Sequence, residues 1–291
     1  MYCDAHVEFI HPKVDLVGFD QSFLYHQVNE DLINEVRPEL VFLAVYILPE
    51  GRKWQKMLWT IKQYLKIIDR NKWVLVKSGK DLDLRGIKVI LHIEDLESIG
   101  SDLSRIDRLH SLGIRSIGMT HNHQNQFAGG SLATEEGITP LGKLAISKIL
   151  ANKMILDFAH LSKKSFLEVC STFNIKPFIS HTGLLYGRYT NPRNVDDQIL
   201  QIVKQKEGFV GIGFAGSFYG KNDASLDNVY DQIQHAENIA SKKHVGIGSD
   251  FGGIVSYLID GLESIAKIDQ LNISHEMLGS NLLHFLNTLD F

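Results

Sequence analysis

The chain has 291 residues, of which 44% are hydrophobic and 22% are charged, and its formal net charge is −4. This balance, without a basic block, argues against nucleic acid as a partner. Two cysteines, Cys3 and Cys170, are too few for a secreted disulfide framework. We find neither a secretory signal nor an apolar run long enough to cross a bilayer. We therefore expect a cytoplasmic protein that does not contact membranes.

Short apolar runs recur along the chain, and most of them end in a polar residue. Runs of this kind are typical of buried parallel strands. The eight strands expected from them cover residues 1–8, 40–46, 87–94, 115–122, 154–160, 177–181, 208–214 and 244–250. A further run at residues 74–76 is short, and we expect it to form a minor hairpin outside the main sheet.

Segments with a helical spacing of large residues alternate with these strands. They cover residues 27–36, 54–70, 102–112, 139–152, 163–173, 197–206 and 226–241. Gly113 is expected to end one helix, Pro140 to lie in the first turn of another, and Ser162 to cap a third. The tail at residues 254–291 also has helical character, with a break expected at Gly279.

Eight strands that alternate with helices predict an α/β protein of the (β/α)8 TIM-barrel type, because eight parallel strands close into a barrel without sheet edges. The length agrees, since such a barrel typically needs about 250 residues. We expect residues 1–291 to form a single domain. The main alternative, a doubly wound open sheet, does not require eight strands.

Six of the eight expected strands end in histidine or carboxylate residues. These are His6, Glu8, Glu94, His121, His160, His181 and Asp250. In an α/β barrel the carboxyl ends of the strands meet at one end of the fold, where the chemistry is found. Imidazole and carboxylate groups are the ligands that divalent metals such as zinc prefer.

The positions of these residues predict a pair of metal sites. His6 and Glu8 are two residues apart on a strand, so their side chains point the same way and can bind one ion. His160 and His181, from successive strands, can hold a second ion. A carboxylate offers two oxygens, so Glu94 can bridge the pair.

Each residue also has a simpler interpretation. A single histidine at a strand end is more often a hydrogen-bonded packing residue than a metal ligand. His92 lies two residues before Glu94 and is expected to be a core histidine. His123 is expected on a loop, and the histidines on expected helices are expected to be solvated: His110, His235, His275 and His284. The joint occurrence at six strand ends favours metal binding, because burying so many polar groups is costly.

In its strand-end motifs the chain resembles the membrane (renal) dipeptidase family of zinc metallopeptidases, a branch of the amidohydrolase-like barrels. The resemblance extends from Asp4 to about Leu286. It rests on Asp4-Ala-His6-Val-Glu8, Ile93-Glu94, Met119-Thr-His121-Asn122, Gly137-Ile-Thr-Pro-Leu-Gly142, Asp157-Phe-Ala-His160-Leu-Ser162, Ser180-His181-Thr182, Arg193-Asn194-Val195 and His244-Val-Gly-Ile-Gly-Ser-Asp250-Phe251. Amidohydrolase barrels that use a carbamylated lysine as a metal ligand need it at the end of the fourth strand. This chain has Thr120-His121-Asn122 there, so a site bridged by glutamate fits better.

The resemblance implies a dipeptidase with two zinc ions, whose bridging hydroxide attacks the peptide carbonyl. His6 and Glu8 would bind one zinc, His160 and His181 the other, and Glu94 both. Three further residues would act on the substrate. His121 would stabilise the oxyanion, Arg193 would bind the terminal carboxylate, and Asp250 would hold the free ammonium or shuttle a proton. Family members are often dimers, so a homodimer is a possible assembly.

Three departures from the family pattern bear on the site. Glu8 replaces an aspartate, and its carboxylate reaches one methylene further. Asp95 and Leu96 replace the glycines that usually follow the bridging glutamate, and Gly252 stands where a second aspartate is common. Two alternative functions follow from the sequence. One is another amide or lactone hydrolase on the same metal site, and the other is a catalytically impaired barrel used for binding.

Overall fold

The computed structural model describes residues 1–10, 21–47, 54–220, 224–255 and 257–291. These residues form two compact units. Unit 1 comprises the described residues of Met1–Phe9, Asp15–Val41 and Ile179–Leu286, and unit 2 comprises the described residues of Ile10–Val14, Phe42–Phe178 and Asn287–Phe291. Each unit is built from parallel strands followed by helices. The expectation of a single domain stays a prediction.

Unit 2 contains a parallel sheet with the strand order β2-β4-β5-β6, and β3 pairs with β4 outside this order. Its strands are β2 (Leu40–Val45, from Phe42 onward), β3 (Val74–Leu75), β4 (Lys88–Ile93), β5 (Ile114–Gly118) and β6 (Ile155–Asp157). The register pairs His92 with Ser116 and Ser116 with Ile155. The register therefore sets side chains from three successive strands side by side.

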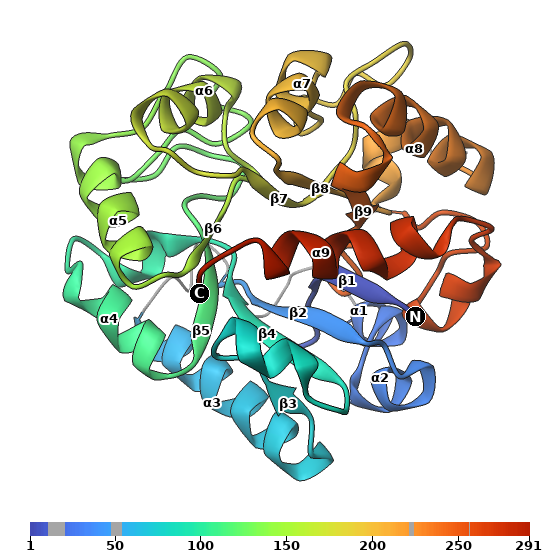
Figure 1. Cartoon of the computed structure of the whole chain (residues 1–291), viewed down its shortest axis with the longest axis horizontal. Helices are drawn as coiled ribbons and strands as arrows, with labels where there is room; N and C mark the ends of the chain where they lie inside the picture. Colours follow the sequence, from blue (N-terminus) through green and yellow to red (C-terminus); the bar gives the residue numbers. More distant parts are fainter. Residues whose placement is uncertain (11–20, 48–53, 221–223, 256) are drawn as a thin grey trace. The chain divides into compact units, whose positions relative to one another are not determined.

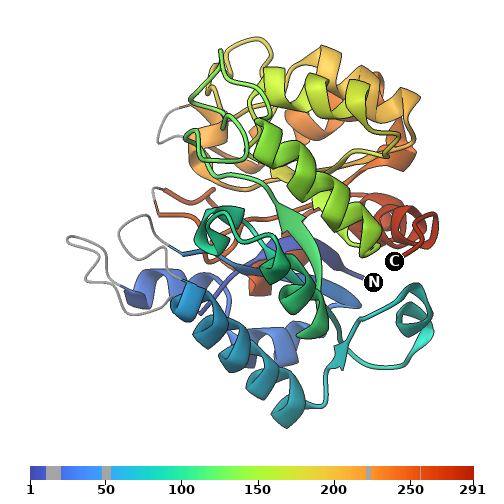
Figure 2. The same cartoon turned by 90° about the vertical axis from the view of Figure 1, so that its left-hand side faces the viewer.

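Helices cover this sheet in the order expected from the sequence (Figures 1 and 2). They are α3 (Trp54–Asn71), α4 (Ser104–Ser111), α5 (Pro140–Ala151) and α6 (Lys163–Thr172), with short 3-10 turns at Gly79–Asp83 and Leu96–Ile99. Thr139 and Ser162 each cap the helix that follows, by accepting a hydrogen bond from a backbone N–H of its first turn. The cap expected at Ser162 is thus confirmed.

Unit 1 contains β1 (Cys3–Val7), β7 (Phe178–Thr182, from Ile179 onward), β8 (Phe209–Ile212) and β9 (Val245–Ile247). Strand β8 pairs in parallel with β9, and the chain after β9 joins β1 through the bridge between Val7 and Phe251. The helices are α1 (Gln21–Gln27), α2 (Glu30–Val36), α7 (Asp197–Gln205), α8 (Leu226–Ala240) and α9 (Asn281–Asn287). Helices α7 and α8 pack together beside these strands (Figure 1).

The expectations about local structure were wrong in four respects: a helix start, a hairpin, two strand ends and the tail. The expected helix at 27–36 begins only at Glu30, because Asn29 is extended and caps α2 through its side chain. Residues 74–75 pair in parallel with β4 rather than forming a hairpin. The strands expected at 115–122 and 154–160 end at Gly118 and Asp157, so the histidines that follow them lie on loops.

The tail is the fourth case. Outside Ser256, which is not among the described residues, it contains a 3-10 segment at Ile265–Gln270, a π turn at Glu276–Ser280 and α9. Gly279 lies inside the continuous helical turn that leads into α9 and is not a break. A side chain there would approach the Cys3 backbone nitrogen and sulfur at 3.1 Å, so the glycine allows close packing against β1.

Candidate metal centres and active site

Unit 2 brings together Glu94, His121 and His160, which we call the Glu94 cluster. The His160 Nε2 atom lies 2.9 Å from Glu94 Oε1, and the His121 Nε2 atom lies 4.0 Å from the same oxygen. Ligand atoms of the three residues lie within 4.8 Å of one another. Each residue follows a different strand, β4, β5 or β6, as the parallel register requires. Three such donors at this spacing suit a divalent cation.

The loop after β6 places His160 in the Glu94 cluster. Asp157 Oδ1 accepts the Ala159 N–H at 3.0 Å, and His160 itself has a left-handed φ of 65°. The His160 Nδ1 atom lies 2.8 Å from Asn122 Oδ1, which also accepts the Ser131 hydroxyl. With Nδ1 held by Asn122, the ring directs Nε2 at Glu94. A hydrogen-bond acceptor on the far ring nitrogen fixes the orientation of a metal-binding histidine.

His121 is the more accessible member of the Glu94 cluster, with 24% of its side chain exposed. Its ring lies between those of His160 and Tyr46, with centroid distances of 4.2 and 4.6 Å. Its backbone N–H donates to Asp95 Oδ2 at 3.3 Å. A histidine held in this way, and open on one side, can contact a bound molecule.

Unit 1 contains a second group of donors, His6, His181 and Asp250, which we call the His181 cluster. The rings of His6 and His181 lie 4.0 Å apart, and His6 Nε2 lies 3.9 Å from Asp250 Oδ1. Their ligand atoms also lie within 4.8 Å of one another. The His181 Nδ1 atom lies 2.9 Å from Ser180 Oγ, which orients the ring. His6 and His181 are fully buried.

Glu8 lies beside the His181 cluster. Burial and the neighbouring Asp250 carboxylate raise the pKa of Glu8 to about 8. Burial also raises the pKa of Asp250 to about 7, because the opposing effect of Arg193 does not offset it and Asp4 adds to the rise. A cation would relieve the repulsion between these carboxylates. The chemistry of the donors in this unit therefore fits a metal ion.

Arg193 is buried at the end of β7. Its Nη2 donates to the His181 carbonyl at 2.9 Å, and its Nη1 donates to Thr182 Oγ1 at 3.4 Å. The guanidinium also lies over the Phe218 ring at 5.7 Å. These contacts fix a positive charge near Asp250, which is the charge expected for binding a carboxylate.

All the predicted site residues fall into one of these two groups. His6, Glu8, His181, Arg193 and Asp250 lie together in unit 1, and Glu94, His121 and His160 lie together in unit 2. Within the units, His121 and Asp250 lie at ligand spacing among the donors, although the sequence predicts substrate roles for them. The predicted pairing of His160 with His181, and the shared role of Glu94, stay predictions.

The sequence did not point to the residues that orient these donors. Asn122 and Ser180 each adjoin a predicted histidine in the chain, and that adjacency was the available signal. Tyr46 directly follows β2, at the strand end where polar residues were expected. Conversely, His92 is confirmed as a buried core histidine, with Nδ1 2.9 Å from Ser116 Oγ and Nε2 3.3 Å from Asp157 Oδ2. His235, expected to be solvated, instead bonds Asp197 at 2.7 Å.

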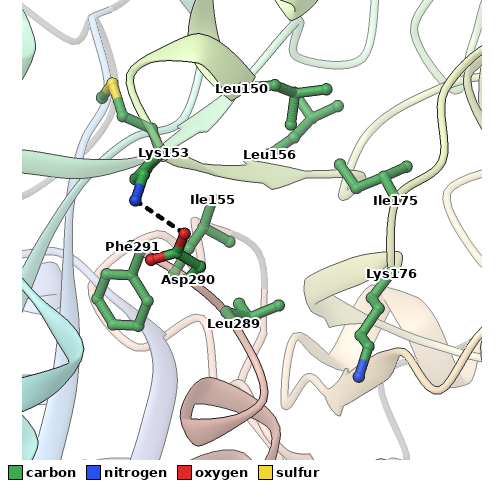
Figure 3. Close-up of a pocket in the computed structure, with 10 residues that line it drawn as sticks. Leu150, Lys153, Ile155, Leu156, Ile175, Lys176, Leu289, Asp290 and Phe291 are labelled. Carbon is green, nitrogen blue, oxygen red and sulfur yellow. Dashed lines mark ion pairs between the residues drawn. The ribbon is translucent and has the colours of Figure 1, made fainter.

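A small cavity lies at the opposite, N-terminal end of β6 (Figure 3). Its volume is about 130 Å³, and its lining is mostly apolar. The Lys153 ammonium and the Asp290 carboxylate form an ion pair of 2.8 Å at its rim. It contains none of the predicted site residues. The candidate site therefore belongs to the other end of the strand, where His160 lies.

Histidine and carboxylate groups at the ends of parallel strands are the arrangement found in metal-dependent hydrolases built on α/β barrels. Comparison with known families identifies the family of such hydrolases to which the chain belongs. The model of the membrane dipeptidase family, peptidase family M19, matches residues 13–278, and the chain belongs to this family. The resemblance stated from the motifs is confirmed.

Two fungal relatives show the extent of the sequence similarity. The chain is 30% identical over 191 residues to an uncharacterized dipeptidase of Schizosaccharomyces pombe, covering 64% of this chain and 46% of that protein. It is 32% identical over 191 residues to dipeptidase aclJ of Aspergillus oryzae, covering 64% of this chain and 45% of that protein. The chain thus spans about half the length of the curated relatives it matches.

Solved structures show the fold over the full chain. A metallo peptidase from Rhodobacter sphaeroides, liganded with a phosphinate mimic of the dipeptide L-Ala-D-Ala, superposes with a TM-score of 0.85 at 20% identity, covering 100% of this chain and 99% of that one. Dipeptidase AC, an M19 metallo peptidase, superposes with a TM-score of 0.83 at 22% identity, covering 98% of this chain and 97% of that one. The expected (β/α)8 fold class is confirmed.

Proposed function

We propose that the chain is a metal-dependent dipeptidase. The observation that carries the proposal is that each unit holds three histidine and carboxylate donors within 4.8 Å of one another, and all six are residues predicted from the strand ends. Membership of the membrane dipeptidase family supports the reaction class. The dipeptide mimic bound by the Rhodobacter sphaeroides relative supports the substrate class.

We propose zinc as the metal, with two ions per chain. His6, Glu8, Glu94, His160 and His181 would supply the ligands. Within unit 1 the buried histidines and raised carboxyl pKa values support cation binding. Within unit 2 the short distance between His160 Nε2 and Glu94 Oε1 supports it. When bound, such ions polarise a carbonyl and make water acidic enough to supply hydroxide near neutral pH.

The residues around these donors would carry out the remaining steps. The partly exposed His121 would donate a hydrogen bond to the oxyanion as the carbonyl carbon becomes tetrahedral. The Arg193 guanidinium would pair with the carboxylate of the dipeptide. Asp250 would accept the substrate ammonium or pass a proton to the leaving amine, a role that suits its pKa of about 7.

The experiment is a combined metal and activity assay on the purified chain. Elemental analysis should find about two zinc ions per chain, and unblocked dipeptides, including some with a D-residue at the C-terminal position, should be cleaved. N-acetylated forms of the same dipeptides are the control for the free ammonium. The proposal is wrong if a broad dipeptide panel stays intact with metal present.

The same assay separates the two alternatives from the sequence. Bound metal without dipeptide cleavage, but with turnover of other amides or lactones, would indicate a different hydrolase on the same donors. A chain that retains no metal after mild purification would indicate a barrel that has lost catalysis.

We also propose a cytoplasmic location and a homodimeric assembly. No described helix has the length and apolar character needed to cross a membrane. Both cysteines are buried. Fractionation of cells that produce the native protein tests the location, and light scattering of the purified chain tests the assembly.

A further inference from the structure

We propose that Asp95 is a positioning residue that sets His121 relative to Glu94; this inference rests on the proposed function of His121. Asp95 directly follows Glu94 and is 5% exposed. It stands where the resemblance leads us to expect glycine. A buried carboxylate at this point is a feature of this chain and requires compensation by hydrogen-bond donors.

Three N–H groups supply that compensation. Asp95 Oδ1 accepts the Glu97 backbone N–H at 2.8 Å and the Asn125 side-chain amide at 3.1 Å. Its Oδ2 accepts the His121 backbone N–H at 3.3 Å. The bond from Glu97 caps the 3-10 turn Leu96–Ile99 and would be sufficient for a structural role. The bond from His121 joins the loop after β4 to the loop after β5.

Asn125 strengthens this connection. Its side-chain amide also donates to the Met119 carbonyl at 2.8 Å, and its Oδ1 accepts the backbone N–H groups of Phe127 and Ala128 at 2.8 and 3.1 Å. His121 lies between Met119 and Asn125 in the chain. Its backbone is therefore held by Asp95 within a loop that Asn125 folds onto the same carboxylate.

Fixing the backbone at His121 fixes where its ring can lie. The ring packs between Tyr46 and His160 and places Nε2 4.0 Å from Glu94 Oε1. A catalytic group loses much of its effect when it is displaced by about 1 Å. Because Asp95 is the chain neighbour of Glu94, one side chain couples the positions of both groups.

The decisive variant is Asp95→Asn, which replaces one carboxylate oxygen by an amide nitrogen and keeps the size of the side chain. The asparagine Oδ1 can still accept from Glu97, but its amide nitrogen would face the His121 N–H, donor against donor. Asp95→Ser is the second variant, since a serine hydroxyl keeps the cap to Glu97 but is too short to bridge to His121. The matched control is Asp102→Asn, because Asp102 lies in the same β4–α4 connection and its carboxylate contacts Ser104 and Arg105.

Two readouts follow the proposed role. In both Asp95 variants kcat should fall about tenfold, with KM and bound metal nearly unchanged, because His121 acts on the transition state. Hydrogen exchange of the His121 backbone amide should become at least about tenfold faster. Asp102→Asn should match the wild type in both. Should Asp95→Asn fail to fold, Asp95→Ser supplies the same two measurements.

The outcomes separate this inference from the proposed function. An active wild type with unchanged kcat and exchange in Asp95→Asn overturns the positioning role and leaves the dipeptidase proposal standing. Recovery of wild-type kcat in Asp95→Ser also overturns it, because the cap alone would then explain the effect. If the wild type cleaves no dipeptide, the proposed function fails, and exchange at His121 alone decides whether Asp95 holds this backbone.

Discussion

The Nε2 atom of His160 lies 2.9 Å from Oε1 of Glu94, while the Nδ1 of the same ring is occupied by Asn122 Oδ1 at 2.8 Å. If Nδ1 carries the proton, the atom that faces Glu94 is a lone pair. Two acceptors at this distance require a proton or a cation between them. The geometry of this pair therefore fits either a protonated imidazole or a shared metal ion, and the choice of residues fits a metal ion.

Replacing Glu94 by glutamine should remove turnover and leave the fold intact. The amide keeps the size of the side chain but loses the charge that offsets a divalent cation, so we expect at least about a hundredfold loss of kcat with reduced bound metal. The exposed Glu135→Gln is the control. Activity assays with circular dichroism check this prediction, and normal turnover in Glu94→Gln would exclude an essential role.

Removing the Asn122 side chain should weaken metal binding without removing a ligand. Asn122→Ala leaves His160 Nδ1 without its acceptor, and loss of such an outer partner typically costs about 10- to 100-fold in metal affinity. Competition with a chelator measures the affinity. Asn152→Ala, which removes an amide bonded to Asp107 and Lys148, is the control. Equal affinity in the two variants would contradict this orienting role.

Metal binding to the metal-free chain should release protons near neutral pH. Because the pKa of Glu8 is raised to about 8, most Glu8 carboxyl groups are protonated at pH 7, and a bound cation must displace that proton. We expect a release of about one proton at pH 7 that falls towards pH 9, and tighter apparent binding as the pH rises. Calorimetry in buffers of different ionisation enthalpy measures it. A Glu8→Gln variant with the same release as the wild type would rule out Glu8 as the source.

Adding one methyl group at Gly253 should disturb the carboxylates of unit 1. The new Cβ atom would lie 2.6 Å from Asp250 Oδ1 and 3.0 Å from Glu8 Oε1, so at least one carboxylate must move. We expect Gly253→Ala to lower kcat/KM by about tenfold or more. Gly79→Ala is the control, since its Cβ would meet no atom within 4 Å. Steady-state kinetics measure the effect. Wild-type activity in Gly253→Ala would show that catalysis does not depend on the positions of the Asp250 and Glu8 carboxylates beside Gly253.

The buried His92 should make stability depend on acid pH. Burial lowers the pKa of His92, and Asp157 opposes this only in part. The unfolded chain, with a histidine pKa of about 6.5, binds the proton more readily than the folded chain. The contribution of His92 is therefore fully present above that pH and is lost as the pH falls from it through the lower pKa of the folded chain.

We expect the slope of unfolding free energy against pH, between pH 7 and 5, to contain up to about 1.4 kcal/mol per pH unit from this group. Urea unfolding of His92→Asn should show a shallower slope and a lower stability at pH 7, because the buried Ser116 hydroxyl loses its hydrogen bond and Asp157 loses the neighbouring imidazole. His123→Asn, on an exposed loop, is the comparison. Equal slopes in the two variants would disprove the assignment.

The amino-acid sequence by itself determined the alternation of strands and helices and the chemical character of the strand ends. A strand buried on both faces must be an apolar run, so the polar residue that ends it stands out. This is why His6, Glu94, His160 and His181 could be found without coordinates, although the strands before His121 and His160 end earlier than expected.

The tertiary structure alone decided which donors share a cluster and what orients them. Periodicity gives a residue's place along its strand but not the path of the loop that follows. The acceptor Asn122, which holds His160, and the carboxylate of Asp95, which holds the His121 backbone, both act through hydrogen bonds made between such loops. Those bonds form only once neighbouring strands are in register, because they join residues from separate parts of the chain.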